Sequence, residues 1–380
     1  MRVLMVCVAL LIAIPGAAQE PAARGLLRVS VTAASSEVPL PYAVLSITQL
    51  NLERFSDARG RIVIPDVAPN TYDVVIRRLG YVPFRGKVTV RAGEPTELNV
   101  QLTRVAQRLS QQLVLAARPC PNPGLPDAAR EPELLGLLSL LQENADRYRL
   151  LVDQYPFVYT QHRALGELRN DVMFVQSVDA VTTPGRSKVL YRKGAVVRRD
   201  GREYTLILPT ILDLTDAAFV RAHCFFYGGA STQETLSGTE TWFQLDFRAD
   251  DKLNAPDVHG TFYLDSATAQ LRKMDLELSR PDRLPSNLRG IASLRGMTTF
   301  TEIASGISVL NAVCAITRLR LDVKRSSPAA GEIIPAELQR LVRYLFTSPP
   351  PDVPQQGTFE VPQWVPQTYL PRKTVWCDAS

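Results

Sequence analysis

The chain has 380 residues, 46% of them hydrophobic and 21% charged, which is a globular composition and excludes a disordered polypeptide. Its length accommodates two domains of ordinary size. The net charge of +5 comes from 43 basic and 38 acidic residues without a long basic run, so nucleic acid is not expected as a partner.

Residues 1–19 have the three-part pattern of a secretory signal peptide. Arg2 supplies the positive charge, an apolar run extends from Val3 to Ile14, and small residues lead to an expected cleavage site near Ala18. The run is too short to span a bilayer, and no later stretch is long enough. Cys7 lies inside the run rather than at its end, so no lipid anchor is expected. We therefore expect an exported protein in the periplasm, at the periphery of the outer membrane or outside the cell.

Residues 25–104 form a succession of short segments in which apolar and polar residues alternate. This period is typical of strands that bury one face. Turn residues separate the segments at "DARG", "APNT" and "RAGEP"; Asp57 to Gly60 is predicted to be a hairpin turn, and Pro69–Asn70 the next turn. The pattern predicts an antiparallel β-sandwich at the N-terminus of a mainly β protein.

The order of "VPLPYAVLSI", "SDARGRIVIPDVAPNTYDVVIRRLGY" and "GKVTV" resembles the carboxypeptidase regulatory-like domain. That domain is a transthyretin-like sandwich found beside zinc carboxypeptidases and at the N-termini of many TonB-dependent outer-membrane proteins. Ser56 stands where the family usually has Thr, which keeps the hydroxyl. The resemblance implies a structural or ligand-contacting accessory with a carbohydrate-binding-like fold, and it does not imply catalysis.

Four residues near Gly80 are candidate ligand contacts of the sandwich. Arg77 and Arg78 lie in a basic cluster that could hold an acidic ligand, although a solvated sheet face is the simpler interpretation. Tyr81 and Phe84 could stack on sugar rings if they are exposed, and packing in the core is the alternative.

Residues 105–130 are predicted to be a linker, because four prolines follow Ala117. An amphipathic helix is predicted from about Glu131 and ends before Pro156. Its apolar residues at helical spacing are Leu134, Leu137, Leu138 and Leu141.

Residues 131–325 are predicted to combine this helix with a second β-rich domain. Strand-like runs recur from Phe157 to Leu278, and the last two flank a hairpin turn at Asp265–Thr268. The segments "TDAAFVRAHCFF" and "DVHGTFYLDSATAQLRKMDLEL" resemble the second domain of bacterial exported proteins that pair a regulatory-like domain with a β-rich domain of unassigned function. That resemblance implies no known activity. An uncharacterised hydrolase and a lipid-carrying half-barrel remain alternatives for this domain.

Residues 326–380 are predicted to contain a short helix over "PAELQRLVRYLF" and a proline-rich tail. Extended polyproline-like structure is expected for the tail, and a docking segment for a partner is the alternative.

Removal of the signal peptide leaves four cysteines in an oxidising compartment, which predicts two disulfides. The cysteines are Cys120, Cys224, Cys314 and Cys377. Their wide spacing disfavours a metal site, and spacing alone leaves all three connectivities open. The proteins that the second domain resembles tend to carry a cysteine just ahead of the helix. That resemblance favours Cys120 with Cys224, which leaves Cys314 with Cys377.

Catalytic signatures are absent from the sequence. His162, His223 and His259 do not occur in the spacings of zinc peptidases, and neither a Gly-x-Ser-x-Gly elbow nor a phosphate-binding glycine loop is present. Asp250–Asp251 could be the carboxylate pair of a glycosidase, but a solvated turn is the simpler interpretation, because adjacent strand residues point to opposite faces.

We therefore expect no catalytic residue, metal or cofactor. The sequence favours a non-catalytic exported protein that acts as a binding or scaffolding component, with an envelope protein or a polysaccharide as partner and with peripheral membrane association as an option. Carbohydrate or envelope-polymer binding by the sandwich is the alternative.

Overall fold

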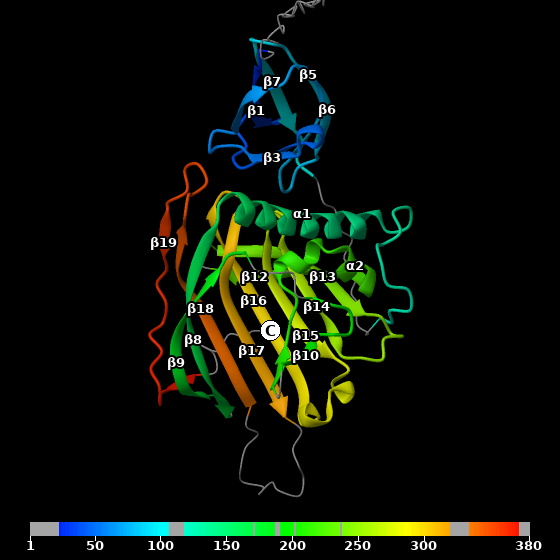
Figure 1. The fold of residues 1–380 in the computed structure, drawn as a ribbon. Helices are drawn as coiled ribbons and strands as arrows, with labels where there is room; N and C mark the ends of the chain where they lie inside the picture. Colours follow the sequence, from blue (N-terminus) through cyan, green and yellow to red (C-terminus); the bar gives the residue numbers. More distant parts are fainter. Residues whose placement is uncertain are drawn as a thin grey trace, which may run out of the picture.

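The computed structural model describes residues 23–105, 118–169, 172–186, 191–200, 203–235, 238–319 and 334–371. Among these residues, no helix is both long and apolar enough to cross a membrane. Figure 1 shows the N-terminal sandwich adjoining the larger second domain at the long helix α1 (Pro132–Gln154).

The N-terminal domain is a sandwich of two sheets. One sheet has the order β4 (Arg61–Val67), β1 (Gly25–Ala33) and β7 (Pro95–Leu102). The other has the order β3 (Leu52–Phe55), β2 (Val44–Ile47), β5 (Asn70–Arg77) and β6 (Phe84–Val90). The predicted alternation is confirmed, since every second residue of β1 is buried in the core between the sheets. One detail differs from a wholly antiparallel sandwich, because β1 and β7 run parallel.

The turn at Asp57–Gly60 forms where predicted, but it does not make a hairpin. It joins β3 to β4, which belong to different sheets. The buried Ser56 hydroxyl accepts the backbone N–H of Ala43 and donates to the carbonyl of Leu40, so it fixes the chain at this crossing. The two bonds need a side-chain hydroxyl at this position, which Ser and Thr both supply.

The second domain is built on one long antiparallel sheet. Its strand order is β12 (His223–Thr235), β13 (Gly238–Ala249), β14 (Asp257–Asp265), β15 (Leu271–Ser279), β16 (Ile291–Ala304), β17 (Ile307–Leu319), β18 (Ile334–Phe346), β8 (Phe157–Arg169), β9 (Val172–Pro184) and β20 (Tyr369–Pro371). A further short strand, β19 (Gln356–Thr358), pairs with β18. A separate ribbon consists of β10 (Val197–Asp200) and β11 (Glu203–Leu206).

The predicted helix over "PAELQRLVRYLF" is wrong, because these residues form β18 between β17 and β8. Leu338 is buried on the opposite face of the strand from Leu341 and Tyr344, and a β-bulge between Leu341 and Arg343 puts these two on the same face. The three buried residues therefore follow one another at three-residue steps. That spacing imitates a helix, whereas the pairing with two neighbouring strands decides the structure. The sheet therefore continues past the predicted domain boundary at residue 325.

One face of the sheet, here called the helix face, is covered by α1 and the short helix α2 (Ala217–Ala222). The helix α1 begins and ends close to the predicted positions, and its predicted apolar stripe is buried. Leu138 of this stripe belongs to the same core as Phe247 and Phe262 of the sheet. Short 3₁₀ turns complete the domain at Ile211–Thr215, Pro281–Arg283 and Ser286–Leu288, and one more, Thr48–Leu50, lies in the sandwich.

The other face, here called the far face, carries a continuous row of residues that lie directly opposite one another on neighbouring strands. The row runs through Asp246, Thr261, Asp275, Met297, Cys314, Leu338 and Ala164. At the Cys314 end, Trp364 and Leu370 of the C-terminal segment pack on it. At the Asp246 end, the row enters a groove.

Candidate binding groove

The sequence-predicted contacts of the sandwich do not come together as a ligand site. Arg77 donates to Glu143 of α1 at 2.9 Å and to Glu53 at 3.1 Å, while Arg78 donates to the Ser305 hydroxyl at 3.0 Å. Both arginines therefore contribute to the junction between the two domains.

Tyr81 and Phe84 are half-buried and pack against the sandwich core. The Phe84 ring lies so close to Gly86 that a Cβ there would come within 2.6 Å of the ring. A ligand-contacting role for these two aromatic residues stays a prediction.

The junction also contains a buried arginine that the sequence did not indicate. Arg147 of α1 is 5% exposed and donates two hydrogen bonds, of 3.2 and 2.9 Å, to the carbonyl of Gly306 in the β16–β17 turn. Burial lowers its pKa to about 9, and burial raises the pKa of neighbouring Glu143. These groups hold the sandwich, α1 and the turn together.

The groove lies on the far face, over β12 to β16, and encloses about 340 Å³. Its walls are charged, hydroxyl and aromatic side chains of neighbouring strands, together with one residue that precedes α1. The principal side chains are Arg118, Phe226, Asp246, Arg248, His259, Thr261, Asp275, Glu277 and Arg295.

Two of the groove carboxylates have basic partners on adjacent strands. Arg295 grips Asp275 with two nitrogens, one of them at 2.9 Å. His259 lies 3.6 Å from Glu277, and its hydrogen bond lowers the pKa of that carboxyl. These two pairs fix the side chains along one side of the groove.

Asp246 has different surroundings. Burial raises the pKa of its carboxyl, while a 2.6 Å hydrogen bond from Thr261 and the more distant charges of Arg118 and Arg248 oppose that effect. The carboxylate lies against Gly228, where a Cβ would come within 2.7 Å of it, at a bulge in β12. The glycine therefore leaves the space that Asp246 occupies.

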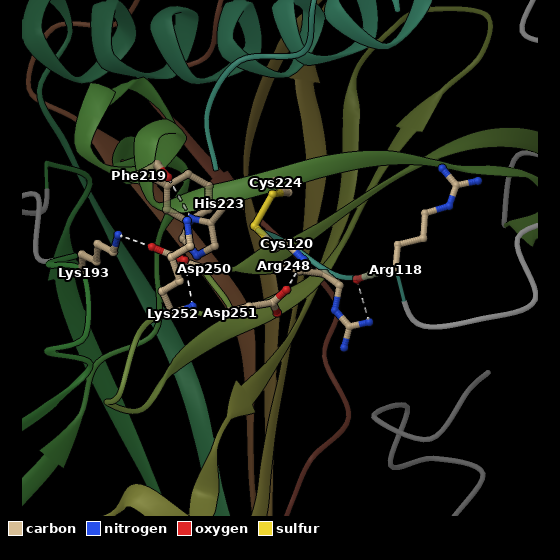
Figure 2. The surroundings of a disulfide bond; sticks show 10 residues. All are labelled: Arg118, Cys120, Lys193, Phe219, His223, Cys224, Arg248, Asp250, Asp251 and Lys252. Atoms are coloured by element: carbon tan, nitrogen blue, oxygen red, sulfur yellow. Dashed lines mark hydrogen bonds and ion pairs between the residues drawn. A yellow bond between two sulfur atoms is a disulfide. The ribbon is translucent and has the colours of Figure 1, made fainter. Parts of the chain in front are cut away.

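The predicted disulfide between Cys120 and Cys224 is confirmed, with a Cα–Cα distance of 5.5 Å. Figure 2 shows how it fastens the segment before α1 to β12. Asp251 strengthens this attachment, because its carboxylate accepts the backbone N–H of Cys120 at 2.6 Å. Cys314 is disulfide-bonded as well. Its predicted partner, Cys377, lies outside the described residues, so that pairing stays a prediction.

Arg118 and Arg248 meet at this attachment. Arg248 donates to the backbone carbonyl of Arg118 at 3.4 Å, and the Arg118 guanidinium lies 5.7 Å from the centre of the Phe226 ring. Among the described residues, neither guanidinium has a carboxylate within ion-pair distance. In Figure 2 the two guanidiniums point in different directions.

The turn predicted at Asp250–Asp251 forms and Asp251 is exposed, but Asp250 is buried rather than solvated. Asp250 is only 9% exposed and accepts from the Lys193 ammonium at 2.8 Å, while Asp251 holds Cys120. Both carboxylates therefore stabilise the loop around the disulfide and do not form a glycosidase pair.

The groove itself was missed by sequence reasoning. Polar and apolar residues alternate in "QLDFR" and "RKMDLEL", but the strand register that brings the charged residues together is not local. His223, in contrast, is a fully buried core residue that bonds the carbonyl of Phe219 at 2.8 Å. No group of three metal-ligating side chains occurs among the residues described.

Comparison with known proteins identifies the first domain. The family model of the carboxypeptidase regulatory-like domain matches residues 27–103. This segment is a carboxypeptidase regulatory-like domain. The regulatory-like domain covers the sandwich and none of the groove.

The second domain receives no such assignment. No curated protein matches the chain. Among solved structures, a Bacteroides fragilis protein of unknown function, described as membrane-associated, covers 84% of this chain and 96% of its own at 11% identity, with a TM-score of 0.17. A DUF1329 family protein from Desulfovibrio piger covers 54% of this chain and 92% of its own at 9% identity, with a TM-score of 0.23. At these TM-scores neither likeness carries an argument.

Proposed function

We propose that this protein is a non-catalytic, exported binding protein of the cell envelope, whose far-face groove binds a polyhydroxylated polymer such as a polysaccharide. The single observation that carries the proposal is the groove of about 340 Å³, in which charged, hydroxyl and aromatic side chains converge. In this proposal the regulatory-like domain supports the second domain structurally and does not itself bind the ligand.

The chemistry of the groove suits sugar hydroxyls, which both donate and accept hydrogen bonds. Asp246 and Glu277 offer acceptors, Thr261 offers a hydroxyl, and Arg248 offers donors. Phe226 supplies an apolar surface for the carbon face of a sugar ring.

Two features favour binding over catalysis and over lipid transport. Of the three groove carboxyls, Asp275 and Glu277 are engaged by Arg295 and His259, which leaves Asp246 alone, whereas a glycosidase needs two available carboxyl groups that face each other. The helix face is filled by the core around Leu138, where a lipid carrier would need a deep apolar pocket.

Affinity electrophoresis through gels that contain dextran or other polysaccharides tests the proposal. We expect retardation of the wild-type protein and a weaker retardation of Phe226→Ala, by about tenfold in affinity, because loss of a stacking ring costs about 1–2 kcal/mol. Release of reducing ends from the polymer would show catalysis and would contradict the non-catalytic part.

Phe84→Ala is the matched control, since it removes the same side chain from the regulatory-like domain. If the loss of affinity follows Phe84 or Tyr81 instead of Phe226, the sandwich is the binding element and the groove proposal fails.

A further inference from the structure

At the end of the groove nearest the disulfide, Arg118 and Arg248 face one carboxylate, Asp246, whose charge they influence from beyond ion-pair distance. Arg295 and His259 are matched by the carboxylates of Asp275 and Glu277. Arg118 and Arg248, in contrast, have no carboxylate at ion-pair distance among the described residues and are both half-buried. A half-buried guanidinium without an ionic partner has strong unused capacity for an anion.

The backbone of Arg118 is anchored through Cys120, and the guanidinium of Arg248 is held by a hydrogen bond. Arg118 precedes Cys120 by two residues, and Cys120 is fastened by the disulfide to Cys224 and by two hydrogen bonds to Asp251. Arg248 projects from β13 on the far face and bonds the carbonyl of Arg118. The disulfide therefore fixes Arg118 at the rim of the groove.

The different directions of the two guanidiniums in Figure 2 exclude a bidentate clamp on one small anion in this arrangement. The two separate guanidiniums instead fit successive acidic groups along one polymer. We infer that Arg118 and Arg248 select a polysaccharide that carries carboxylate or phosphate groups, and that the Cys120–Cys224 disulfide is needed for this selection. The inference rests on the proposed function of the groove.

The experiment compares the affinities of the full protein for polygalacturonate, a phosphorylated mannan and neutral dextran. Arg118→Ala and Arg248→Ala should each lower the ratio of acidic-polymer to dextran affinity by about tenfold, because each variant removes a charge-assisted hydrogen bond to an acidic group. The acidic polymer that shows the larger change distinguishes carboxylate from phosphate. Arg28→Ala, at an exposed ion pair on the sandwich, is the control and should leave the ratio unchanged.

A Cys120→Ser/Cys224→Ser variant should lose the same selectivity while it remains folded by circular dichroism. If that variant does not fold, the two arginine variants still decide the question. Free galacturonate should compete only weakly, since it offers one acidic group to two separate contacts.

An unchanged ratio in both arginine variants, with dextran still bound, would overturn the inference and leave the proposed function intact. Absence of binding to every polysaccharide would overturn both. If polyglutamate binds as tightly as the acidic polysaccharides and dextran does not bind, the groove recognises charge alone. The inferred selection of a polysaccharide would then be wrong.

Discussion

The arginines of the domain junction and those of the groove differ in how fully their guanidiniums are engaged. Arg77 and Arg147 are engaged by Glu143, Glu53 and the carbonyl of Gly306, whereas Arg118 and Arg248 have no ionic partner among the described residues. Arg77 and Arg78 of the basic cluster in the sequence therefore lie at the domain junction. Arg118 and Arg248, which no sequence pattern indicated, line the groove. Pairing, rather than residue type, thus separates the structural charges of the junction from the charges that we propose to contact a ligand.

Among the variants, removal of the disulfide should lower stability most, and it tests the region around the groove. The Cys120–Cys224 bridge spans 104 residues, so its removal should lower the free energy of unfolding by about 2–5 kcal/mol. Urea unfolding of Cys120→Ser/Cys224→Ser measures this. A loss confined to acidic-polymer binding, with stability unchanged, would show that the bridge positions Arg118 without stabilising the fold.

Arg147→Met tests the junction side. The variant leaves the Gly306 carbonyl without two hydrogen bonds in a buried site, so we expect a loss of about 2–4 kcal/mol. Arg28→Met at the exposed pair with Glu97 is the control and should stay within about 0.5 kcal/mol of wild type. If the two variants unfold at the same urea concentration, Arg147 does not stabilise the junction.

Gly306→Ala sharpens the same point through the backbone. Gly306 has a φ of 71°, and a Cβ there would lie 2.2 Å from the Arg78 guanidinium. Gly93 has a φ of 72° with nothing within 4 Å, so Gly93→Ala carries the conformational strain alone, about 1–2 kcal/mol. Gly306→Ala should cost about 1–3 kcal/mol more by thermal unfolding, because Arg78 must move. Equal losses would mean that Arg78 yields freely and is not part of a tight junction.

Asp246→Asn should produce the smallest change, and the change should be stabilising. Burial raises the pKa of this carboxyl in the folded protein, so its ionised form opposes folding above that pKa, and the cost disappears below the unfolded value of about 4. The gain in urea midpoint should therefore appear at neutral pH and vanish as the pH falls to about 4. Asp282→Asn, at an exposed carboxylate, serves as the control. A gain that persists in acid would point to a cause other than ionisation.

Local patterns predicted the parts of the fold that depend on local order. The alternation in β1 and β5 and the leucine stripe of α1 appeared as expected, since each element buries one face. The strand β18 was mistaken for a helix because burial on both of its faces, together with a bulge, gave its buried residues helical spacing. The groove could not be predicted, because Asp246, Thr261 and Asp275 become neighbours only through the pairing of three strands.

The attachment of Cys120 also affects how the two domains can separate. Cys120, which the disulfide joins to β12, lies between the sandwich and α1 in the sequence, so the sandwich is connected to the second domain closer in sequence than the start of α1 at Pro132. A short connection keeps the effective concentration of the sandwich high at the surface of the second domain that it contacts. Opening of the junction should therefore be brief and reversible, and a partner that binds the buried sandwich surface must compete with an intramolecular neighbour.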